Sequence, residues 1–171
     1  MIKFKLTLFL TAILLTACNQ NKTADKPLKS SPLEREKVET KEDKVKNALT
    51  FINGYTDNAN KMNKAVGMQE WVNSSSLATP HFKKELKRIM DEAYKEDPEL
   101  GLGSDPVFDA QDNPNAFELE SLDENTNYLI VKGKDWPEFT LSMKVVKVNG
   151  KWLVDGCGIV NIPNDKRRSR E

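Results

Sequence analysis

Residues 139–155 read FTLSMKVVKVNGKWLVD, and this stretch predicts a β-hairpin. Large apolar residues alternate with smaller or polar ones before Asn149-Gly150, as expected for a strand with one buried face. Asn-Gly is the strongest short-range signal for a two-residue type I′ turn, and such a turn sets the register of the flanking strands. The predicted pairs are Val148 with Lys151, Lys147 with Trp152, Val146 with Leu153, Val145 with Val154, and Lys144 with Asp155.

A second strand is predicted from Asn127 to Lys132, whereas the chain before Pro98 has helical periodicity. The first helix is predicted from about Asp43, and Gly54 interrupts its pattern. An extension of this helix back to the charged residues after Leu33 stays open. Its apolar positions, at i, i+3, i+4 and i+7, are Val45, Ala48, Leu49 and Ile52.

Two more helical segments are predicted before the strands. Residues 62–67 indicate a short, loose helical piece that ends at Gly67. The strongest helix signal begins at Thr79, a favourable N-cap, with Pro80 at the first helical position, and it ends at Asp97-Pro98. Its apolar stripe consists of Phe82, Leu86, Ile89, Met90 and Ala93.

Helices first and strands afterwards predict an α+β fold. Both faces of the predicted hairpin are partly apolar, so we expect helices to cover one side of the sheet and the sheet to curl around a core on the other side. Residues 43–163 are sufficient for one such domain with a hydrophobic core. Residues 164–171 are basic and are expected to form a disordered tail.

The N-terminus predicts secretion and lipid attachment. Residues 1–17 combine a basic start, a short apolar core and small residues before Cys18, as in a signal peptide. Leu15-Thr16-Ala17-Cys18 resembles the bacterial lipobox, whose cysteine is acylated and becomes the first residue of the mature protein. Residues 18–42 would then be the lipidated cysteine and a flexible polar tether. Asn19 resembles the pattern that permits sorting to the outer membrane.

Two further segments resemble a known family. Residues 97–114 read DPELGLGSDPVFDAQDNP, and residues 151–156 read KWLVDG. Together they resemble a family of small bacterial envelope lipoproteins of unknown function, whose domain is similar to the nuclear transport factor 2-like (cystatin-like) cone. The resemblance covers residues 43–163 and implies N-terminal helices packed in the concavity of a strongly bent antiparallel sheet. Enzymes of this superfamily place Asp, His or Tyr inside the cone, and no such set aligns here.

The charge balance argues against nucleic acid as a partner. The chain has 26 basic and 26 acidic side chains, so it has no large field of one sign. The expected partners are the lipid bilayer, reached through acylated Cys18, and an unidentified envelope protein. The predicted location is the bacterial cell envelope, at the outer membrane and facing the periplasm.

A possible recognition loop contains Asp105, Asp109, Gln111 and Asp112. Its three carboxylates supply the oxygen ligands that calcium prefers, but their spacing does not fit an EF-hand. Asp-Pro and Asp-Asn-Pro are also common in turns and caps. Three interpretations stay open: a structural turn, which the composition favours, a cation site, and a partner-recognition loop. No residue is assigned as a metal ligand.

No catalytic residue is predicted. His81, the single histidine, follows a helix start, and no serine elbow or Cys-His pair accompanies it. Residues 73–76 read NSSS and are expected to form a loop. Cys157 lies among apolar residues and glycines, which favours burial. The tryptophans and tyrosines are expected to fill the core rather than to line a ligand pocket.

These observations favour a non-enzymatic, membrane-tethered binding lipoprotein that uses no cofactor. It would act as an accessory or inhibitor of an envelope partner, for example as an immunity-type protein that neutralises a periplasmic toxin. The alternative is a small-ligand carrier or an enzyme that uses the cone pocket. An empty cavity on the order of several hundred Å³ would favour the alternative, whereas a core filled by aromatic rings would favour protein binding.

Overall fold

A computed structural model describes residues 32–168 of the 171-residue chain, and the side chains of residues 42–168. Cys18, the predicted signal peptide and most of the predicted tether lie outside these residues. In the described part, three α-helices precede an antiparallel sheet of four strands in the order β1-β2-β3-β4. The predicted α+β class is confirmed.

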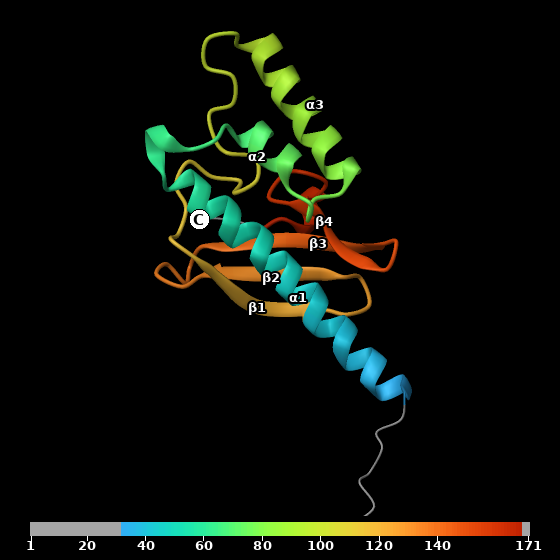
Figure 1. Cartoon of the computed structure of the whole chain (residues 1–171). Coiled ribbons are helices and arrows are strands. Elements are labelled where there is room, and N and C mark those ends of the chain that lie inside the picture. The colour runs from blue at the N-terminus through green and yellow to red at the C-terminus, as the bar shows by residue number, and fades with distance from the viewer. Residues whose placement is uncertain (1–31, 169–171) are drawn as a thin grey trace, which may run out of the picture. The chain divides into compact units, whose positions relative to one another are not determined.

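The helices are α1 (Pro32–Ala59), α2 (Met68–Ser74) and α3 (Pro80–Glu96), with a 3-10 turn, η1 (Met62–Lys64), between the first two. The strands are β1 (Phe117–Asp123), β2 (Tyr128–Gly133), β3 (Thr140–Val148) and β4 (Lys151–Cys157), and η2 (Asn164–Lys166) follows them. α1 crosses one face of the sheet, and its N-terminal part continues beyond the sheet (Figure 1). None of the described helices has the length and apolar character needed to cross a bilayer.

α1 is longer than the predicted helix at both ends. It begins at Pro32, within the expected tether and before the predicted domain start at residue 43, and it continues through Gly54 to Ala59. Gly54 does not interrupt the helix. Its missing Cβ leaves room for a neighbouring ring, since a Cβ there would lie 3.3 Å from the indole of Trp71. The buried face carries Ala48, Phe51, Ile52 and Tyr55 at helical spacing.

The second helical piece lies later than predicted. Only the 3-10 turn η1 precedes Gly67, and α2 begins after it and includes Ser74. Asn58 accounts for the non-helical chain before Gly67, because its side chain accepts a hydrogen bond from the Val66 amide (3.0 Å) and donates one to the Val66 carbonyl (2.7 Å). The predicted loop at residues 73–76 is therefore limited to its last two residues.

α3 has the predicted start and end. Thr79 is the N-cap, and its Oγ1 accepts a hydrogen bond from the Phe82 amide at 2.9 Å. Pro80 occupies the first helical position, where its missing N–H has no intrahelical partner to lose. The helix ends at Glu96, before Asp97-Pro98. The local sequence signals were sufficient here.

The β3–β4 hairpin turns at Asn149-Gly150, where both residues have positive φ. The first four predicted strand pairs, counted from the turn, are present. The fifth is wrong: Lys144 lies opposite Gly156, because a bulge leaves Asp155 outside the ladder. A bulge inserts one extra residue into one strand, so the pairing beyond it shifts by one.

The other two strands differ in how well the sequence predicted them. β2 begins and ends within one residue of the predicted strand, whereas β1 is absent from the predicted elements. A bulge between Leu119 and Ser121 in β1 breaks the two-residue alternation on which a strand prediction depends.

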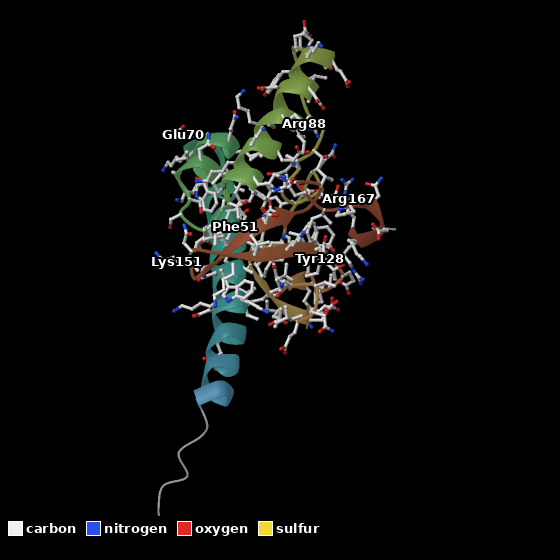
Figure 2. All side chains as sticks on the ribbon, turned by 90° about the vertical axis from the view of Figure 1, so that its right-hand side faces the viewer. Phe51, Glu70, Arg88, Tyr128, Lys151 and Arg167 are labelled. Atoms are coloured by element: carbon white, nitrogen blue, oxygen red, sulfur yellow. The ribbon has the colours of Figure 1, made fainter. Side chains whose placement is uncertain are left out.

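Aromatic rings fill the interior between the helices and the sheet. Phe51 of α1 lies within 5.5–6.5 Å of the rings of Tyr55, Trp71 and Phe82. Figure 2 labels Phe51 on α1. From Tyr55 the chain of ring contacts continues through Phe108, Phe117 and Phe139.

Two aromatic side chains do not follow the expected core-filling role. Tyr94 is 50% exposed and Trp136 is 45% exposed. Cys157 is buried, as predicted, and its thiol donates a hydrogen bond to the Val107 carbonyl at 3.3 Å.

The chain after β4 lies against the domain as far as residue 168. Ser142 Oγ donates a hydrogen bond to the Lys166 carbonyl at 2.6 Å, and Arg167 donates to the carbonyls of Ile162 (2.9 Å) and Ile159 (3.2 Å). These hydrogen bonds involve residues within 164–168, the described part of the predicted tail, whose disorder stays a prediction. Residues 169–171 lie outside the described part.

Candidate binding groove beside the Asp105 loop

A surface groove of about 340 Å³ lies between α3, the start of α2 and the segment that follows α3. Its apolar lining consists of Met68, Met90, Tyr94, Leu100 and Leu102. Its polar lining consists of Gly103, Ser104, Asp105 and Gln111. Leu100 is 78% exposed and Tyr94 is 50% exposed, so apolar surface at the groove is accessible to solvent.

The turn after α3 shapes one wall of the groove. Oδ1 of Asp97 accepts hydrogen bonds from the amides of Glu99 (3.1 Å) and Leu100 (3.0 Å), which reverses the chain. Gly101 has a φ of 62°, and a Cβ at this position would lie 2.7 Å from Cε1 of Tyr94. Only glycine therefore allows the tyrosine ring to lie against this turn. The arrangement places Leu100 at the surface.

The Asp105 loop, residues 105–112, forms the polar side of the groove. Oδ1 of Asp105 accepts hydrogen bonds from the amides of Val107 (2.7 Å) and Phe108 (3.2 Å). The backbone of Asp105 also pairs with that of Ala110 in both directions. Val107 and Phe108 are buried in the core. These contacts hold the loop close to the domain.

A side chain from α1 reaches the same carboxylate. The hydroxyl of Tyr55 donates a hydrogen bond to Oδ2 of Asp105 at 2.6 Å. Gln111 adds a second link within the segment, because its Nε2 donates to the Gly103 carbonyl at 3.0 Å. Hydrogen bonds therefore connect the groove wall to α1 and also connect two parts of the wall to each other.

Burial controls the ionisation of this pair. It raises the pKa of Asp105 above the usual value of an aspartate, and the hydrogen bonds from Tyr55, Phe108 and Val107 oppose the shift. Burial also raises the pKa of Tyr55, and the neighbouring carboxylate raises it further. The tyrosine therefore stays protonated and acts as a donor rather than as a base.

The structure brings only part of the predicted recognition loop to the groove. Asp105 and Gln111 line it, whereas Asp109 and Asp112 do not. Asp109 has a φ of 55°, a left-handed conformation that aspartate tolerates better than most residues. Asp112 is exposed. The turn chemistry expected for the segment is present at Asp105, which accepts from two backbone amides.

Sequence reasoning missed the apolar half of the groove. The apolar stripe of its helix predicts Met90 in the core, whereas the residue is half-buried and lines the groove. Leu100 and Leu102 flank Gly101, and Gly103 follows Leu102, so the available signal was a pair of large apolar residues in a glycine-rich turn. Met68 could not be linked to them, because the contact joins segments more than thirty residues apart.

A second polar cluster lies where α3 meets β4. Oδ1 of Asp155, the bulge residue, accepts a hydrogen bond from Thr79 Oγ1 at 2.6 Å and lies 3.2 Å from Nδ1 of His81. Asn161 donates to the Asp155 carbonyl at 2.7 Å. The His81 side chain is 66% exposed. The cluster ties the helix start to the sheet, and Thr79 bonds the carboxylate rather than the imidazole, unlike a catalytic triad.

The described residues contain no group of three or more His, Cys, Asp and Glu side chains that could hold a metal ion. The three carboxylates of the Asp105 loop accordingly do not converge in the described structure.

No family model, no curated protein and no solved structure matches the chain.

Proposed function

We propose that this protein is a lipid-anchored lipoprotein of the bacterial envelope that binds a partner protein through the groove beside the Asp105 loop. It would act there as an accessory subunit or as an immunity-type inhibitor. The observation that carries the proposal is the accessible apolar surface at the groove, with Leu100 78% exposed. Exposed apolar side chains around a concave surface with a few polar groups are typical of binding sites.

The anchor rests on Leu15-Thr16-Ala17-Cys18, the lipobox-like sequence behind a signal peptide. Acylated Cys18 would hold the domain at the membrane, and Asn19 is compatible with the outer membrane. Restricting the domain to the membrane surface raises its effective concentration near an envelope partner, so a groove of modest size would be sufficient.

The helices and the antiparallel sheet have the order expected for a nuclear transport factor 2-like cone, and we propose this finer classification. The resemblance to the envelope lipoprotein family belongs to the same proposal. Both concern the domain formed by α1 to β4.

A small-ligand carrier or enzyme that uses the cone pocket is the second candidate. Size alone is in its favour, since the groove of about 340 Å³ reaches the volume of small-molecule sites, but no residue of the sheet lines this groove. Against it, Phe51, Tyr55, Phe108 and Phe117 occupy the interior where a cone would hold its ligand. Their burial leaves protein binding as the better-supported function.

Site-specific photo-cross-linking in growing cells tests the proposed function. A photoreactive amino acid replaces Leu100 in one variant and Val148 in another. Val148, at the hairpin between β3 and β4, is a matched control, because it is an apolar side chain that is 36% exposed and does not line the groove. We expect a discrete cross-linked envelope protein from position 100 and none from position 148. Equal products from both positions, or none from either, would contradict the proposal.

A further inference from the structure

The groove has one charged side chain and a long apolar wall. Among the described residues that line it, Asp105 is the only acid, and no lysine or arginine lines it. The apolar wall is formed by Met68, Met90 and Tyr94. A ligand that fills this space therefore meets flexible thioethers and an aromatic ring along most of its length and a carboxylate at one point.

Among residues 42–168, no side chain supplies a cation to that carboxylate. The ion pairs between described side chains do not include Asp105. The cations of the middle of α3 are engaged with acids of their own helix, Lys87 with Asp91 (2.6 Å) and Arg88 with Glu85 (2.6 Å). A largely buried carboxylate without a cation is an unfavourable arrangement that a bound cation would relieve.

The surroundings of the groove are negatively charged, like Asp105. α3 ends beside it, and the C-terminal end of a helix carries partial negative charge. Glu96, Asp97 and Glu99 add three acids at this end, against one cation of its last turn, Lys95. The electrostatics therefore favour a ligand with an apolar body and a positive end.

We propose that the groove binds a lysine or arginine side chain of the partner protein. This inference rests on the proposed function and specifies the chemistry of that same site. The aliphatic stem packs against Met68 and Met90, since methionine side chains adapt to irregular partners. The cation meets Oδ2 of Asp105, which accepts one hydrogen bond from Tyr55 and keeps a further lone pair. Tyr94 offers its ring face to the same cation.

Small probes test this proposal without knowledge of the partner. The purified full chain is labelled with ¹³C at the methionine methyl groups, and NMR follows Met68 and Met90 at the groove and buried Met143 as an internal control. N-acetyl-arginine amide is titrated against N-acetyl-citrulline amide, which has nearly the same shape without the charge. Agmatine represents a free small cation.

We expect saturable shifts of Met68 and Met90 with the arginine probe, at least about fivefold weaker binding of citrulline, and no shift of Met143, because a charge-assisted hydrogen bond adds about 1 kcal/mol. Asp105→Asn should abolish the preference for arginine, and Asp112→Asn, which removes an acid that does not line the groove, should keep it. An unchanged Met143 signal in each variant shows that the core is intact.

Equal binding of arginine and citrulline, or a preference that survives Asp105→Asn, would overturn the proposal. Tighter binding of agmatine than of the arginine amide would assign the groove to a free small cation and would also overturn it. These outcomes are separate from those of the cross-linking experiment. If a partner is cross-linked at position 100 but the groove shows no preference for arginine, the proposed function holds and this inference fails. If the groove prefers arginine but no partner is cross-linked, the proposed function fails and the groove still binds a cationic side chain.

Discussion

Tyr55 and Asp105 form a hydrogen bond of 2.6 Å between residues that are fifty positions apart in the chain. Tyr55 lies in α1 and is 2% exposed, whereas Asp105 opens the loop that forms the polar side of the groove. The bond couples the position of this loop to the helix that covers the sheet. The groove therefore has a rigid polar side and an adaptable apolar side.

The first prediction concerns this hydrogen bond. Tyr55→Phe should lower the free energy of unfolding by about 1–3 kcal/mol, because it leaves a largely buried carboxylate without one of its donors. Chemical denaturation measures the change. Tyr94→Phe is the matched control, since this tyrosine is 50% exposed and should change stability little. Equal effects of the two substitutions would show that the Tyr55 hydroxyl does not stabilise the fold.

The second prediction concerns pH. Burial raises the pKa of Asp105 in the folded protein above its value in the unfolded chain. The contribution of this carboxyl to stability is therefore complete below the unfolded pKa, about 4, and is lost as pH rises through the folded pKa. The stability of the wild type relative to Asp105→Asn should thus be higher near pH 4 than near pH 7. Denaturation curves at the two pH values measure it, and an opposite trend would contradict the assigned cause.

A third prediction concerns the hairpin turn. Gly150 has a φ of 82°, and a Cβ there would meet nothing within 4 Å, so strain of the backbone is the only cost of a side chain. Gly150→Val should lower the free energy of unfolding by more than about 1 kcal/mol. Gly103→Val is the control, because Gly103 has equal space around its Cβ position and no positive φ. An unchanged melting temperature for Gly150→Val would show that a side chain at this positive φ does not strain the backbone.

Local signals in the sequence were reliable where one element decides the outcome. Thr79-Pro80 gave the start of α3, and Asn149-Gly150 gave the turn and four strand pairs. The prediction failed at Asp155, which lies at a bulge and accepts a hydrogen bond from Thr79, the N-cap of α3, because the alternation of the strand contains no trace of this contact. The strand pairing beyond this point could not be predicted from the alternation of apolar and polar residues alone.

The candidate site was predictable only in part for the same reason. Asp105 was identified from its own segment, where turn chemistry and a carboxylate occur together. Its contact with Tyr55 and the position of Met68 beside Met90 depend on how α1, α2 and α3 pack. Periodicity places such residues on a face of a helix, but it does not say which other segment that face meets.

A fourth prediction concerns the anchor, which lies outside the described residues. The wild-type protein should incorporate a fatty-acid label and sediment with membranes, whereas Cys18→Ser should lose the label and leave the membrane fraction. Cys157→Ser is the control, because this cysteine is buried in the core and should have no part in acylation. Absence of label from the wild type would make the anchor reading wrong.

The affinity of the cross-linked partner for purified variants tests the central claim most directly. Dissociation constants are measured for the wild type, for Leu100→Asp at the groove and for Val148→Asp at the hairpin. We predict at least about tenfold weaker binding for Leu100→Asp, the loss expected for one apolar side chain buried at an interface, and less than about twofold change for Val148→Asp. Wild-type affinity in Leu100→Asp would contradict the claim that the groove beside Asp105 holds the partner.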